Sequence, residues 1–112
     1  MRALIVFSCM LAICLTATRA FCHSPQDMVI SVSGENIDVI VTHPVSDPTS
    51  HFVKTIKVSL NGVLLIEQTF FLQSGNEQRA RYNIPGLKKS ESVTVAAYCS
   101  ISGSLIRNSQ AE

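Results

Sequence analysis

The sequence predicts an all-β, immunoglobulin-like antiparallel β-sandwich of about seven strands. After residue 20 the apolar residues alternate with polar ones or form short runs rich in Val, Ile, Thr and Phe, without helical periodicity. Turn residues separate these runs at regular intervals. Short strands with this spacing, within a chain of this length, are typical of a two-sheet sandwich.

The first two strands come from an apolar run and an alternating run. Residues 28–32 form the apolar run, and residues 33–36 supply the turn that follows it. In the next segment Ile37, Val39 and Val41 fall on one face of a strand, which is the period-two pattern of a half-buried strand.

A long loop follows the second strand. The strand runs directly into His43, and Pro44 and Pro48 exclude regular structure from there to His51. We therefore expect the two imidazoles to stand at the two ends of one loop.

A hairpin is predicted next, because two expected strands at residues 52–60 and 63–72 are joined by Asn61 and Gly62. Asn-Gly between two such strands is the strongest short hairpin signal. The side chains that we expect this hairpin to contribute to the core are Phe52, Ile56, Val58, Leu60, Leu64, Ile66 and Phe70.

The remaining segments predict three more strands. Residues 78–84 follow a turn at residues 73–77, and Arg79 and Arg81 fall on the face that we expect to meet solvent. Residues 92–98 are apolar enough to be a central strand. This strand ends at Cys99, Gly103 lets the chain reverse, and a short final strand is expected at residues 105–107.

The N-terminal residues have the pattern of a signal peptide. Residues 1–20 have a basic start, an apolar run too short to span a bilayer, and small residues before a cleavage site after Ala20. We expect export to the periplasm or the extracellular space, with a single domain at residues 21–112. Cys9 and Cys14 would leave with the leader.

Charge excludes two classes of partner. Removal of the leader leaves seven Lys and Arg against eight Asp and Glu. A nearly neutral domain has no electrostatic attraction for nucleic acid or for an anionic membrane surface. We therefore expect no nucleic-acid partner and no stable membrane insertion once the leader is cleaved.

Four side chains at predicted strand ends have the chemistry of metal ligands. They are His23, His43, His51 and Cys99, which include every His of the chain. Imidazole and thiolate bind iron, zinc and copper well, and strand ends cluster at the rims of a sandwich. The alternative for Cys99 is a disulfide with Cys22, the default for two cysteines in an oxidising compartment.

The same residues resemble a known family, the iron-binding domain of desulfoferrodoxin and neelaredoxin, which are superoxide reductases. The matching residues are His23, the pair His43 and Pro44, the run His51-Phe52-Val53, and the pair Tyr98 and Cys99 with Gly103. The resemblance implies a mononuclear non-haem iron centre with equatorial imidazoles from His23, His43 and His51 and an axial Cys99 thiolate. It implies reduction of superoxide to hydrogen peroxide, with electrons from a separate donor, and it leaves a homo-oligomer open.

The chain departs from the pattern of that family in three places. Ser102 stands where the family has its fourth His, and Phe21 and Cys22 replace the Glu-Lys pair that precedes the first His. The loop from His43 to His51 is also two residues longer than the usual form. A site with three His and one Cys also suits copper or zinc, so both metals stay open beside iron.

Three non-catalytic interpretations of the sequence also remain. The N-terminal residues after cleavage, Phe21, Cys22 and His23, would suit Cu(II), which makes an envelope copper binder one alternative. The pairs His43-Pro44, His51-Phe52 and Asn61-Gly62 also resemble the sulfur-carrier-binding subunit of thiosulfate oxidation, which implies an interaction module. A sandwich closed by Cys22 and Cys99 without metal is the third.

Overall fold

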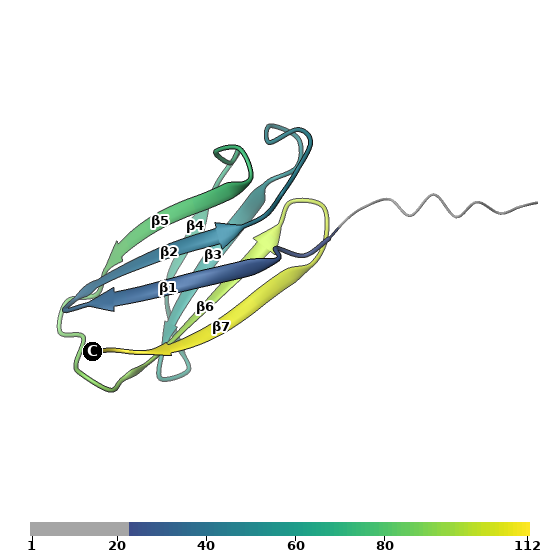
Figure 1. Ribbon diagram of the computed structural model, residues 1–112. Helices are drawn as coiled ribbons and strands as arrows, with labels where there is room; N and C mark the ends of the chain where they lie inside the picture. Colours follow the sequence, from purple (N-terminus) through teal and green to yellow (C-terminus); the bar gives the residue numbers. More distant parts are fainter. Residues whose placement is uncertain (1–22) are drawn as a thin grey trace, which may run out of the picture.

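The computed structural model describes residues 23–112 and places seven strands there in two antiparallel sheets. One sheet has the order β1-β2-β5 and the other β4-β3-β6-β7 (Figure 1). The strands are β1 (Asp27–Ser33), β2 (Asn36–Thr42), β3 (Val53–Leu60), β4 (Val63–Thr69), β5 (Glu77–Asn83), β6 (Ser92–Cys99) and β7 (Ser104–Gln110). This arrangement confirms the predicted all-β sandwich. No helix in the described part is long and apolar enough to cross a membrane.

The core lies between the sheets and is built from β-branched residues at alternate positions. Each strand that contributes to it shows the expected period of two, most clearly β2 and β6. The fully buried apolar side chains are Ile37, Val39, Val41, Val53, Ile56, Val58, Val93, Val95 and Ala97.

The hairpin of β3 and β4 turns at Asn61 and Gly62, as predicted, and both have positive φ, 49° and 83°. A register shift between Val58 and Ser59 sets Ser59 opposite Leu64 instead of Leu65. The prediction that Leu64 faces the core is therefore wrong, because the shift aligns it with the outer face, where it is 50% exposed.

The other expected core residues of the hairpin fall into two groups. Ile56 and Val58 are fully buried, whereas Leu60, Ile66 and Phe70 are partly buried and pack against the core. Phe52 precedes β3 and is half-buried. The final strand is longer than predicted, because polar residues after Arg107 pair with β6 at the edge of the sheet.

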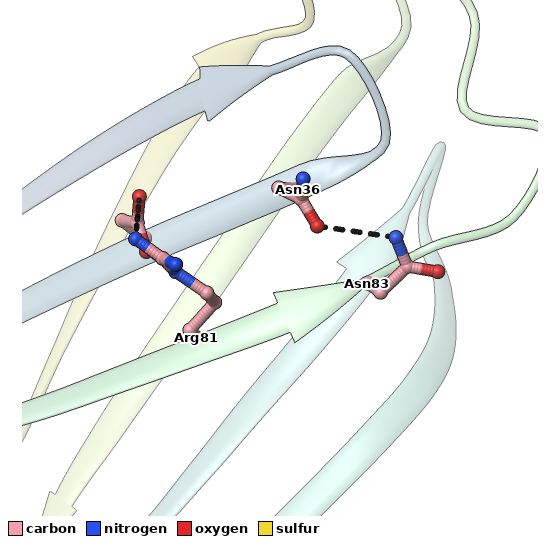
Figure 2. A network of polar contacts seen from close by, with 4 residues as sticks. Asn36, Arg81 and Asn83 are labelled. Atoms are coloured by element: carbon pink, nitrogen blue, oxygen red, sulfur yellow. Dashed lines mark hydrogen bonds and ion pairs between the residues drawn. The ribbon is translucent and has the colours of Figure 1, made fainter.

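The outer face of the three-stranded sheet carries polar side chains in cross-strand pairs. Arg81 donates from Nε to Asp38 Oδ1 at 2.6 Å, and Asn83 donates to Asn36 Oδ1 at 3.1 Å (Figure 2). Both pairs join residues that lie directly opposite each other in β2 and β5. These exposed contacts favour the observed register, and they confirm the expected solvent face of Arg81.

Three connections meet at one end of the sandwich. The β2–β3, β4–β5 and β6–β7 loops lie there together with the chain that leads into β1, while the C-terminus lies toward the other end (Figure 1). Two of these connections cross from one sheet to the other. Residues far apart in the sequence are thereby gathered at one rim.

Tyr82 carries a hydroxyl in the core that is buried and has no hydrogen-bond partner in the described part of the chain. Burial raises the pKa of Tyr82 to about 12. The Tyr82→Phe variant should therefore be more stable by about 1 kcal/mol, because a buried unpaired hydroxyl is costly.

The pH dependence separates this effect from a packing change. Between about pH 10 and 12 the unfolded chain loses the phenolic proton that the folded chain keeps, so wild-type stability falls in that range. Urea unfolding should show the advantage of Tyr82→Phe growing as the pH rises above 10. An advantage that stays constant would contradict the burial argument.

Candidate metal centre

The rim at this end of the sandwich gathers all three histidines and Cys99. His43 follows β2 directly, Cys99 is the last residue of β6, and His51 stands two residues before β3. One ring nitrogen from each of His43 and His51 and the Cys99 Sγ lie within 4.8 Å of one another. The structure thus brings both ends of the long loop to the end of β6.

His23 joins this group from the segment before β1. Its ring centroid lies 5.3 Å from that of His43 and 5.5 Å from that of His51, and the latter two are 4.8 Å apart. His23 is half-buried. Three imidazoles thus surround one small space beside a buried thiol.

His43 is held rigidly and completely buried. Its main-chain N–H donates to the Asn76 carbonyl at 2.8 Å, and its Nδ1 lies 2.9 Å from the Gln73 Oε1. The other ring nitrogen, Nε2, is buried and has no hydrogen-bond partner in residues 23–112. A buried polar atom without a partner is costly, and a metal ion bound to the nitrogen lone pair would remove that cost.

His51 is positioned by a compact turn in the long loop. Its N–H donates to the Asp47 carbonyl at 2.9 Å, while the Asp47 carboxylate accepts from the Thr49 N–H at 3.0 Å and the Thr49 hydroxyl at 2.7 Å. The hydrogen bonds from Thr49 lower the pKa of Asp47, which keeps the carboxylate ionised as an acceptor. The loop therefore has defined structure despite its length.

The surroundings of His51 favour the neutral form of its ring. Its pKa is lowered first by burial and then by the nearby rings of His43 and His23. A neutral imidazole has a lone pair available for a metal ion. The His51 Nε2 lies 3.0 Å from the Cys99 Sγ, so the two atoms are close enough that one ion could contact both.

Cys99 ends β6 in a tight loop. Its N–H donates to the Gly103 carbonyl at 2.9 Å, and the Ile101 N–H lies 3.5 Å from its Sγ. The sulfur therefore has a weak main-chain hydrogen-bond donor beside it. The neighbouring Ser100 N–H donates to the Phe52 carbonyl at 2.8 Å and so ties this loop to the start of β3.

Two predicted features stand apart from this cluster. Ser102, at the position of the family's fourth His, is exposed in the β6–β7 loop. Cys22 lies outside the described residues, so the Cys22–Cys99 disulfide stays a prediction. The structure therefore groups ligand atoms of His43, His51 and Cys99, with the His23 ring beside them, and imidazole and thiol donors suit iron, zinc or copper.

One residue beside the site, Gln73, could not be predicted from the sequence. It was expected only as part of a turn, yet its side chain is 3% exposed and contacts His43. A glutamine in a turn is ordinarily solvated, so no sequence pattern distinguishes this one.

Gly103 makes a close approach that positions His23. It has a φ of 89°, and a methyl group there would lie 2.5 Å from the Ser24 Oγ and 3.0 Å from the Ser24 Cα. The segment that carries His23 thus packs directly on the Cys99 loop. Only glycine meets both the steric and the conformational demand.

A matched pair of variants isolates this contact. Gly103→Ala should lower stability by about 1 to 3 kcal/mol through backbone strain, and should also displace Ser24. Gly86→Ala is the control, because Gly86 has a similar φ of 81° and open space around it. Hydrogen exchange of the Gln26 amide, which donates to the Thr42 carbonyl at 2.8 Å, reports the docking of the segment.

We expect faster exchange at Gln26 in Gly103→Ala than in Gly86→Ala at equal global stability. Equal exchange rates in the two variants would mean that the contact with Ser24 does not hold the segment.

Comparison with known proteins yields matches in structure alone. No protein-family model matches the chain, and no curated protein matches it. A superoxide reductase (1Fe-SOR) from Giardia intestinalis is similar with a TM-score of 0.61 and 20% identity, over 79% of this chain and 99% of that one.

Two further structures support the same fold. A hypothetical protein from Pyrococcus horikoshii has a TM-score of 0.55 and 22% identity, over 80% of this chain and 88% of its own. A superoxide reductase (neelaredoxin) from Ignicoccus hospitalis has a TM-score of 0.51 and 16% identity, over 80% and 81%. The chain therefore has the fold of the superoxide reductases.

Proposed function

We propose that this domain binds one metal ion between His23, His43, His51 and Cys99, and that the ion is iron in a centre that reduces superoxide to hydrogen peroxide. The observation that carries the proposal is the buried, unpartnered Nε2 of His43 beside His51 and Cys99. The fold shared with superoxide reductases supports iron as the metal.

Some residues of the chain would bind the ion, and others would set its electronic properties. The three imidazoles would supply nitrogen donors, and the lowered pKa of His51 favours the neutral ring that can bind a metal ion. The Ile101 N–H beside the Cys99 Sγ moderates the charge that the thiolate donates. When bound, ferrous iron would supply the one electron that, with two protons, converts superoxide to hydrogen peroxide.

A second candidate is a closed zinc or copper(I) site without catalysis. Three nitrogens and one sulfur equal the four donors of a tetrahedral structural site. The observation that favours it is the exposed Ser102 in place of a fifth strong donor. In this case the ion would stabilise the rim of the sandwich and leave no position for a substrate.

The setting of the activity is part of the same proposal. The leader-like residues 1–20 support export to the periplasm or extracellular space. Superoxide is the small-molecule partner, and a separate electron donor restores the reduced centre after each turnover. Neither nucleic acid nor a membrane is a partner in this proposal.

The first test is elemental analysis with an optical spectrum of the mature protein, purified without chelators or an affinity tag. We expect one iron per chain and a visible thiolate-to-ferric band that is lost in Cys99→Ser and kept in the matched Cys22→Ser variant. Stoichiometric zinc or copper without that band would favour the second candidate.

Superoxide consumption by the iron-loaded protein tests the reaction itself. We expect at least a tenfold loss of rate in His43→Ala, a size typical of a disrupted metal site. A rate equal to that of wild type would remove the enzymatic claim. Thiol counting under denaturing, non-reducing conditions completes the test, since two free thiols agree with a Cys99 ligand and none indicates the Cys22–Cys99 bridge.

A further inference from the structure

The side-chain amide of Gln73 makes four hydrogen bonds inside the rim. Its Oε1 lies 3.0 Å from the Val53 N–H and 2.9 Å from the His43 Nδ1. Its Nε2 lies 2.6 Å from the His43 carbonyl and 2.9 Å from the Gly75 carbonyl. The side chain is buried, so water does not substitute for these partners.

The main-chain partners fix which end of the amide is oxygen. The Val53 N–H can only donate, so the atom that faces it must be the acceptor. The carbonyls of His43 and Gly75 can only accept, so the atom that faces them must be the NH₂ group. A flipped amide would lose all three of these bonds at once.

This orientation determines the protonation of the His43 ring. Because Oε1 only accepts, the Nδ1 that lies 2.9 Å from it must carry a proton. In the neutral ring the lone pair then lies on Nε2, the buried atom without a partner. The opposite tautomer would set two lone pairs against each other and bury an N–H without an acceptor.

We propose that Gln73 is a positioning residue that selects the Nδ1–H tautomer of His43 and so presents the Nε2 lone pair to a metal ion. The selection of the tautomer is a property of the metal-free protein, and only its use rests on the metal centre proposed above. Gln73 also joins His43 to Val53 and Gly75, which fixes the plane of the ring.

Two substitutions of Gln73 distinguish selection of the His43 tautomer from a purely structural role in holding the loops together. Gln73→Met removes the acceptor and the NH₂ donors while keeping a similar volume. Gln73→Glu also lacks the NH₂ donors to the two carbonyls, but keeps an oxygen acceptor for the Nδ1–H and for the Val53 N–H. The matched controls are Gln68→Met and Gln68→Glu, because Gln68 is an exposed residue of β4.

The test is a two-bond ¹H–¹⁵N correlation spectrum of the histidine rings in metal-free protein at about pH 8.5, above the ordinary imidazole pKa of about 6.5. We expect a protonated Nδ1 and an unprotonated Nε2 for His43 in wild type, in Gln73→Glu and in both controls. Gln73→Met should show a substantial shift toward a protonated Nε2.

Either of two results would overturn the proposal. A wild-type His43 with its proton on Nε2 would do so without any variant, even if Gln73→Met fails to fold. Loss of the Nδ1–H tautomer in Gln73→Glu as well as in Gln73→Met would show that Gln73 acts only as a brace.

Titration of the metal-free protein with Co²⁺ alone then measures whether the selected tautomer strengthens metal binding. Loss of a partner that orients a ligand lowers metal affinity by about 10- to 100-fold, and we expect that loss in Gln73→Met with a smaller one in Gln73→Glu. If wild-type protein binds no Co²⁺ while the tautomers behave as expected, the metal centre fails and the role of Gln73 stands. Equal Co²⁺ affinity in wild type and Gln73→Met would contradict its role in presenting the lone pair.

Discussion

The candidate site depends on the contact between two loops that cross from one sheet to the other at the same rim. The β2–β3 loop begins with His43, and the β4–β5 loop contains Gln73 and Asn76. Asn76 accepts the His43 N–H, and the amide of Gln73 returns a hydrogen bond to the His43 carbonyl. With these bonds a completely buried histidine keeps its main chain hydrogen-bonded, while one ring nitrogen has no partner among residues 23–112.

The strands could be predicted because short-range patterns specify them. Alternating β-branched residues in β2 and the Asn61-Gly62 turn determine local structure almost regardless of the rest of the chain. The errors arise where tertiary structure decides. A register shift reverses the face of Leu64, and pairing with β6 extends β7 into a polar segment that has no strand pattern of its own.

The convergence of the candidate ligands could be expected for a different reason. Imidazole and thiol are rare side chains with distinctive chemistry, and the antiparallel sandwich brings alternate strand ends to one rim, so His43, His51 and Cys99 converge. Gln73 could not be found this way, because its role comes from burial and from four simultaneous partners. Candidate ligands can be recognised from their residue type in the sequence, whereas the residues that orient them can be recognised only in the folded chain.

The number of donors, more than the fold, decides what such a centre can do. Structures at 16 to 22% identity share the fold of this chain. In this chain Ser102 is exposed, and the candidate donors are three imidazoles and one thiol. Four donors complete a tetrahedral ion and leave two positions open on a six-coordinate one. In the proposed function, the same rim would hold zinc as a structural site or iron as a reactive centre, and the coordination preference of the metal would decide between the two.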